Sequence, residues 1–136
     1  MNLPFKSRLS FVLWLLIPSV TWIAPCRAAQ GSEEGREAAA FARAEKAEKL
    51  GNYPAAEKIY QQVLREHPGE MAAELNLGLT YYVDRRYADS VSHLMKALQA
   101  KPDLFPALMV GGVDFIKMGN PQRAIPLLRR ARALRP

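Results

Sequence analysis

Apolar residues recur every three or four positions through residues 37–136, with polar residues between them. This spacing is typical of amphipathic α-helices. Three prolines, Pro68, Pro102 and Pro136, follow one another at intervals of 34 residues, and each closes a stretch with the pattern of two short helices. A repeat of this length predicts stacked helical hairpins, here residues 37–70, 71–104 and 105–136.

Within these units, small and large residues fall at matching offsets. Gly78 and Gly112 lie where the two helices of a hairpin must approach closely, and larger apolar residues lie three or four positions away on the same face. Gly51-Asn52 and Gly119-Asn120 combine a residue that can end one helix with a residue that can cap the next. The pattern describes packing rather than chemistry.

The central unit carries the clearest signature, which consists of Leu77, Gly78, Tyr81, Tyr87, Ala97 and Pro102. With these residues it resembles the tetratricopeptide repeat. It departs from the family at Glu74, where a bulky aromatic residue is preferred, and at Ser90, where alanine is preferred. The resemblance implies an all-α fold, a right-handed α-solenoid of three helix-turn-helix repeats, over residues 37–136.

The resemblance also implies a concave face lined by the first helix of each hairpin. On the two later units this face would consist of Leu75, Leu79, Tyr82, Val83, Met109, Val113, Ile116 and Lys117. One interpretation is a hydrophobic groove for a peptide of a partner protein. The other is that some of these residues pack against neighbouring helices or against further repeats. In the first unit, Phe41, Glu45, Glu48 and Lys49 would make this face mixed and charged.

One known use of the family is a clamp of Lys, Asn and Arg side chains that holds the C-terminal carboxylate of a chaperone. In this sequence only Asn76 matches a clamp position. The other clamp positions carry Phe41, Glu45, Pro106 and Val110. Because apolar or acceptor-only groups cannot replace cationic donors, we expect no chaperone-tail binding of that type.

No catalytic constellation is visible in the sequence. His67 and His93 stand alone, without a carboxylate or cysteine at the spacing of metal ligands. We therefore expect a protein that is not an enzyme and that uses no cofactor and no metal.

Residues 1–28 have the order of a secretory signal peptide: a positively charged start, an apolar run and small residues at Ala28-Ala29. The run is short for a membrane span. Export to the periplasm or secretion is therefore expected, and residues 29–36 are expected to form a linker. Two alternatives stay open, a membrane anchor left uncleaved and a lipid on Cys26, whose preceding residue Pro25 departs from the lipoprotein motif.

Loss of the signal would lower the formal charge from +6 to +3, and five arginines within residues 123–136 carry much of what remains. A near-neutral body argues against a nucleic-acid partner. The sequence thus predicts a non-catalytic scaffold of the bacterial cell envelope that binds a protein or peptide, touching a membrane only through its N-terminal segment. The alternative is the N-terminal repeat segment of a larger envelope enzyme or assembly protein.

Overall fold

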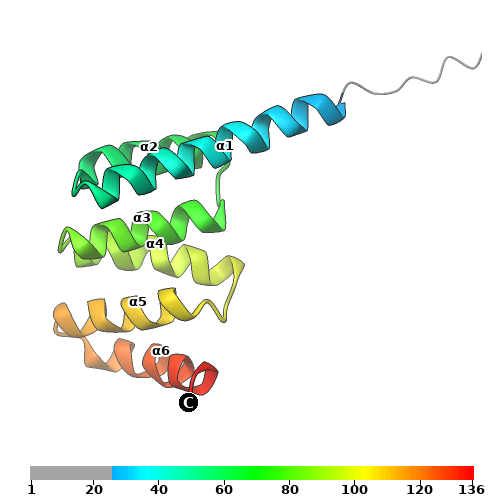
Figure 1. Ribbon diagram of the computed structural model, residues 1–136. Coiled ribbons are helices and arrows are strands. Elements are labelled where there is room, and N and C mark those ends of the chain that lie inside the picture. Colours follow the sequence, from blue (N-terminus) through cyan, green and yellow to red (C-terminus); the bar gives the residue numbers. More distant parts are fainter. Residues whose placement is uncertain (1–25) are drawn as a thin grey trace, which may run out of the picture.

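The computed structural model describes residues 26–136, which form six α-helices and no strand (Figure 1). The helices are α1 (Cys26–Lys49), α2 (Tyr53–Glu66), α3 (Met71–Val83), α4 (Tyr87–Ala100), α5 (Phe105–Lys117) and α6 (Pro121–Leu134). They pair as three hairpins that stack on one another along the chain. The predicted all-α solenoid of three helix-turn-helix repeats is confirmed.

The turns inside the hairpins share one backbone conformation. Gly51 and Gly119 have φ values of 73° and 72°, and Arg85 takes φ 60° at the equivalent place in the second hairpin. The next helix is capped by Asn52 in the first hairpin and by Asn120 in the third, whose side chains accept hydrogen bonds from backbone N–H groups. Arg85 therefore holds a left-handed conformation that glycine adopts more readily.

The two helices of a hairpin approach each other closely at Gly78 and at Gly112. A Cβ atom added to Gly78 would lie 2.7 Å from the side chain of Leu94, and one added to Gly112 would lie 2.6 Å from Leu128. Real Cβ atoms do not approach neighbouring atoms this closely. In the second and third hairpins, a glycine of the first helix thus packs directly against a leucine of the second helix.

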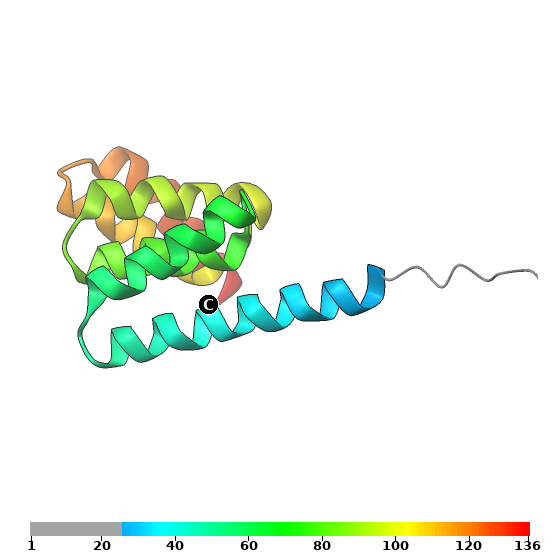
Figure 2. The same cartoon turned by 90° about the horizontal axis from the view of Figure 1, so that it is seen from above.

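Helix α1 differs from the prediction at its start. It begins at Cys26, so residues 29–36, expected to be a linker, continue the same helix. Good helix formers such as Glu33, Arg36 and Ala38 offset the cost of Gly31 and Gly35, which is about 1 kcal/mol each. Figures 1 and 2 show the N-terminal part of α1 extending beyond the other helices. Of the expected signal, residues 1–25 lie outside the described residues.

The core runs between the hairpins as well as within them. At one end it contains Ala44, Ala56, Tyr60, Leu77 and Tyr81, from α1, α2 and α3. Nearer the C-terminus it contains Leu94, Leu98, Ala107, Leu108 and Ala131, from α4, α5 and α6. Each hairpin therefore buries apolar surface against the next, as expected for a stacked repeat.

Candidate functional site

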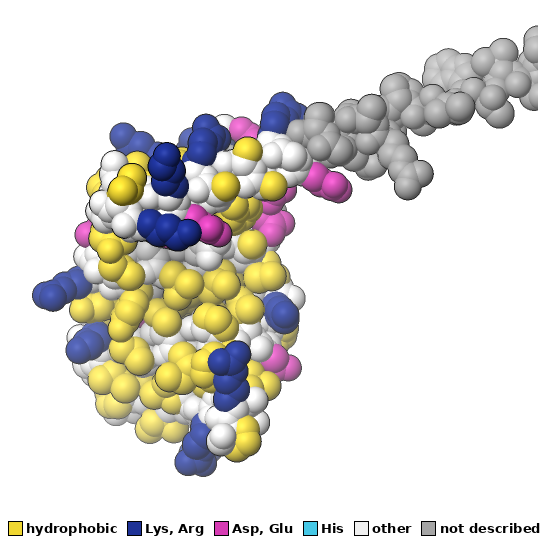
Figure 3. All heavy atoms as spheres, in the orientation of Figure 1, with side chains coloured by type: hydrophobic (Ala, Val, Ile, Leu, Met, Phe, Trp, Pro, Cys, Tyr) yellow, Lys and Arg dark blue, Asp and Glu magenta, His cyan; other side chains and the backbone are white. Residues whose placement is uncertain are grey.

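The residues predicted to bind a partner lie on α3 and α5. Val83, Met109 and Ile116 are 51%, 37% and 51% exposed, and Lys117 is also exposed. Figure 3 shows hydrophobic side chains gathered over α3 and α5, on the side where these helices lie in front in Figure 1. We call this surface, formed by the eight predicted residues, the apolar face. Contiguous exposed apolar patches are a feature of interaction sites.

Part of the apolar face also serves the fold. Leu75 and Leu79 are half-buried and pack against the core cluster that contains Leu108. The ring of Tyr82 lies 6.4 Å from that of Tyr87 on α4. These three residues therefore pack partly against neighbouring helices, as the alternative interpretation of the sequence expects. No contact with a partner is present to test the binding role of the eight residues, which stays a prediction.

The same side of α1 is charged. Glu45 and Lys49 are exposed, and the carboxylate of Glu48 lies 2.7 Å from the hydroxyl of Thr80 on α3. Phe41 turns inward, where its ring lies 5.7 Å from that of Tyr60. Burial, then the charges of Glu48 and Glu45, raise the pKa of Tyr60 above its ordinary value. The apolar face thus gives way to a charged region at the first hairpin, as the sequence predicted.

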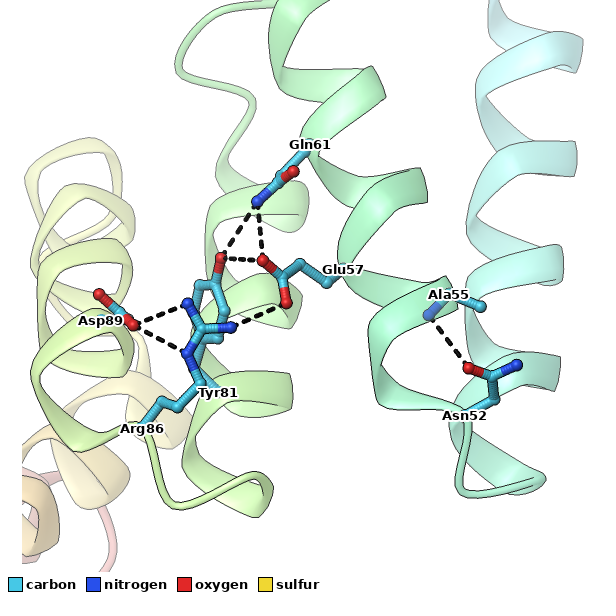
Figure 4. A network of polar contacts seen from close by, with 7 residues as sticks. All are labelled: Asn52, Ala55, Glu57, Gln61, Tyr81, Arg86 and Asp89. Atoms are coloured by element: carbon cyan, nitrogen blue, oxygen red, sulfur yellow. Dashed lines mark hydrogen bonds and ion pairs between the residues drawn. The ribbon is translucent and has the colours of Figure 1, made fainter.

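A polar network joins the first two hairpins (Figure 4). The carboxylate of Glu57 accepts hydrogen bonds from Tyr81 Oη at 2.9 Å, Gln61 Nε2 at 3.0 Å and Arg86 at 2.9 Å. The guanidinium of Arg86 also lies over the ring of Tyr81 and pairs with Asp89. Burial and the hydrogen bond to Glu57 raise the pKa of Tyr81. These groups satisfy one another, so the network has a structural role.

His93 is not alone, contrary to the sequence-based interpretation. Its Nδ1 lies 2.5 Å from Oε2 of Glu74, a residue that is only 5% exposed. The imidazole ring lies 5.4 Å from the ring of Tyr81. Lys96 Nζ lies 3.7 Å from the other oxygen of Glu74. The prediction was wrong because Glu74 and His93 are 19 residues apart and meet only once α3 packs on α4.

A second buried acid, Asp114, was missed altogether. It is fully buried on α5, where Oδ2 accepts a hydrogen bond of 2.6 Å from Ser90 while Oδ1 has no partner. Burial raises its pKa, and the bond from Ser90 opposes that shift. Ser90 is one of the noted departures from the family pattern, and it was the available signal that a polar partner lies opposite.

Three arginines in and directly after α6 contact other parts of the chain. Arg123 and Arg135 each place their guanidinium 4.2 Å from the centre of a ring, that of Phe115 and that of Phe105. Arg130 pairs with Asp103 at 2.7 Å. Their positive charge therefore lies beside α5 and the loop before it, while Ile125 and Leu134 stay exposed on α6.

Neither metal nor membrane sites stand out in the described part of the chain. No group of three or more His, Cys, Asp and Glu side chains there could hold a metal ion. Within the same residues, no helix has both the length and the apolar character needed to cross a bilayer.

Stacked helical hairpins with a 34-residue period define the chain as an α-solenoid repeat protein. A family model of the tetratricopeptide repeat matches residues 41–104, which include all of α2, α3 and α4. Together with the fold, this match supports the tetratricopeptide-repeat family. No sequence match to a curated protein was found.

Solved tetratricopeptide-repeat structures share the fold. The second such domain of Spaghetti (RPAP3), bound to the HSP90 peptide SRMEEVD, has 16% identity and a TM-score of 0.72, covering 79% of this chain and 98% of that one. The TPR2B domain of yeast Sti1 in its pHsp70 complex has 16% identity and a TM-score of 0.67, with coverages of 71% and 78%.

A third similar structure is part of a much longer protein. A mutant of the Thermobaculum terrenum O-GlcNAc transferase has 25% identity and a TM-score of 0.70 over 76% of this chain. The match covers only 20% of the transferase. The likeness therefore concerns one part of that enzyme.

Proposed function

We propose that the chain is a non-catalytic protein-interaction scaffold that binds a peptide or protein segment on the apolar face of α3 and α5. The observation that carries the proposal is the exposure of Val83, Met109 and Ile116 on neighbouring first helices of a tetratricopeptide-type stack. Two proteins of the same fold are solved with chaperone peptides or complexes, which supports a peptide as the kind of partner.

The chemistry of the apolar face favours a partner that differs from a chaperone tail. Exposed apolar side chains dominate the face, and Lys117 is the one cation among its eight residues. Asn76 is the single residue that matches the carboxylate clamp, and the other clamp positions hold no arginine or lysine. We therefore propose an amphipathic partner segment whose apolar side chains cover α3 and α5.

A pair of isoleucines with nearly equal exposure gives a direct test. Ile116 on the apolar face and Ile125 on α6 are 51% and 53% exposed. The wild type, Ile116→Glu and Ile125→Glu would each be used as bait in an extract of the source cells, with bound proteins identified by mass spectrometry. We expect Ile116→Glu to lose specific partners and Ile125→Glu to keep them, because only the former places a charge in the apolar face.

The comparison needs one control. Circular dichroism should show equal helix content in both variants, as expected for exposed positions. If the two variants retain the same partners, or lose the same partners, the apolar face is not the binding surface.

We also propose that the scaffold works outside the cytoplasm, in the periplasm or as a secreted protein. The support is the charged, apolar and small-residue order of residues 1–28. N-terminal mass spectrometry of the protein from soluble and membrane fractions would test this. A mature chain that starts near Ala29 and is soluble supports export with cleavage. An intact Met1, or a lipid on Cys26, supports a membrane-tethered scaffold instead.

A second candidate is the repeat segment of a larger enzyme or assembly protein. The observation in its favour is that the similar repeats of the O-GlcNAc transferase occupy only 20% of that chain. Detection of the native protein by immunoblot would separate the two candidates. A band at or somewhat below 15.2 kDa, the mass of the chain before any cleavage, favours the scaffold, and a much larger band favours the segment.

A further inference from the structure

The Glu74–His93 pair is peculiar to the central hairpin. Thirty-four residues later the same two positions hold Leu108 and Leu127, which pack in one apolar cluster. In the first hairpin they hold Ala40 and Ile59, which also share an apolar cluster. The fold therefore builds this contact twice from apolar residues and once from a carboxylate and an imidazole.

Packing alone does not explain the polar version. A buried ionic pair is usually no more stabilising than well-packed apolar residues of similar volume, because both groups must lose their water. Glu74 nevertheless keeps its carboxylate almost fully buried against Nδ1 of His93. A polar pair at a position that the fold can fill with two leucines indicates a role other than stability.

The pair lines a cavity between α2 and α4. This cavity has a volume of about 780 Å³, and we call it the α2–α4 groove. Its lining residues include Leu64 and Arg65 of α2, Glu74 of α3, and His93 and Lys96 of α4. It lies between second helices of neighbouring hairpins, whereas the apolar face lies on the first helices α3 and α5.

The charges around the α2–α4 groove are arranged for an anion. Glu74 is its one acidic lining residue, and both oxygens of that carboxylate already face cationic or N–H groups, namely His93 and Lys96. Lys96 is about half exposed, and its 3.7 Å separation from Glu74 is too long for a hydrogen bond. Arg65 is exposed and hydrogen-bonds only the neutral amide of Gln62 among the described residues. Both cations can therefore turn to an incoming carboxylate.

His93 adds a third polar group to the groove. Glu74 occupies Nδ1, while Nε2 has no partner among the described residues. The positive charge of the groove belongs to Arg65 and Lys96.

We propose that the α2–α4 groove is a second interaction site, which binds an acidic peptide segment of a partner protein. One carboxylate of the segment lies between Arg65 and Lys96, and a polar group of the segment contacts Nε2 of His93. Apolar parts of the segment contact Leu64 and Pro68, which also line the groove. The site is separate from the apolar face, so the two proposals stand or fall independently.

The test uses a defined probe and the full-length chain. A short peptide of glutamate and alanine is titrated into the isotope-labelled protein, beside counterparts in which lysine or glutamine replaces glutamate. We expect saturable chemical-shift changes of backbone amides in residues 61–69 and 93–100 with the glutamate peptide only. The absence of apolar side chains larger than alanine in the probe limits its binding to the apolar face.

Three variants locate the binding. Lys96→Glu should weaken it about tenfold, the effect expected when a cation that meets a carboxylate is reversed. Arg129→Glu makes the same charge change on an exposed residue of α6 and should leave the affinity within about twofold, because rim charges away from the contact act weakly. The double variant Glu74→Leu, His93→Leu copies the third hairpin and should weaken binding several-fold without loss of helix content.

The outcomes separate clearly. Shifts confined to the groove, together with loss of binding in Lys96→Glu and in the leucine pair, support the proposal. It is overturned if no saturable shift appears, or if the lysine peptide binds equally well. It is also overturned if Arg129→Glu weakens binding as much as Lys96→Glu, since the peptide then only follows the overall positive charge.

Discussion

The junction between the first and second hairpins and the junction between the second and third use the same positions with different chemistry. In the first, Tyr81 meets Glu57 and Gln61, which hydrogen-bond to its hydroxyl. Thirty-four residues later, Phe115 meets Val91 and Met95 in an apolar cluster. A hydroxyl and two polar partners have been exchanged together for three apolar groups.

This difference shows that the repeat preserves shape rather than a particular interaction. Both junctions have an aromatic ring on the first helix, and in both an arginine guanidinium lies 4.2 Å from the ring centre: Arg86 at Tyr81 and Arg123 at Phe115. What varies is whether the groups around the ring are polar or apolar. The first junction should therefore respond to salt and to loss of single partners, and the second should respond to loss of buried volume.

The largest expected effect belongs to the apolar junction. Leu94 is fully buried, contacts Gly78 of α3 and belongs to the cluster that contains Leu108. We expect Leu94→Ala to lower the free energy of unfolding by about 2–5 kcal/mol, through lost burial and the cavity left behind. Urea unfolding followed by circular dichroism measures this. The loss should be the same at low and high salt, and a strong salt dependence would contradict an apolar junction.

The polar junction should show a smaller effect that can be reversed. We expect Glu57→Val to lower the free energy of unfolding by about 1–2 kcal/mol, because Tyr81 and Gln61 lose their shared acceptor. Adding Gln61→Met and Tyr81→Phe, which copies the second junction, should restore most of the loss. The measurement is urea unfolding of the single and triple variants. A triple variant less stable than Glu57→Val would show that the two junctions are not interchangeable in shape.

The buried acid of the second junction should make stability depend on pH. Burial raises the pKa of Asp114 in the folded protein. The folded state therefore holds the proton more tightly than the unfolded state, and this stabilising contribution is complete below the unfolded pKa and lost as the pH rises through the folded pKa. Asp114→Asn does not titrate, so it should gain stability relative to the wild type between acidic and neutral pH. Urea unfolding over that range tests the sign, and a pH-independent difference would contradict it.

The smallest effect is expected at the surface of the second junction. Arg130 and Asp103 pair at 2.7 Å, but both side chains are largely exposed. We expect Arg130→Ala to change the free energy of unfolding by less than about 0.5 kcal/mol. A loss comparable to that of Glu57→Val, measured in the same urea experiment, would mean that this junction also depends on charge.

The helices could be predicted from the sequence because the residues that end helices and allow close packing recur in more than one hairpin. Pro68 and Pro102 mark the ends of hairpins, and Gly78 and Gly112 mark the close approaches that the structure contains. Arg85 shows the limit of such signals, since its left-handed conformation comes from the hairpin and not from its own preference.

The polar contacts were harder to predict. Glu74 and His93 come from different helices, and nothing in either helix alone reports the register that brings them together. Asp114 has the same difficulty, because a carboxylate in an amphipathic helix is ordinarily assigned to the exposed face. For Glu74 and His93, comparison of equivalent positions offers the missing signal, since the third hairpin has Leu108 and Leu127 there.

The Glu57 network fixes the order in which the hairpins can follow one another. Consider a duplicate of residues 71–104 placed directly after the original. Its tyrosine would pack against Val91 and Met95, and neither side chain can accept a hydrogen bond as Glu57 does. The third hairpin offers Phe115 there instead. Units that look interchangeable along the sequence thus have individual neighbours, and a change in their order would leave a buried phenol among apolar side chains without a hydrogen-bond acceptor.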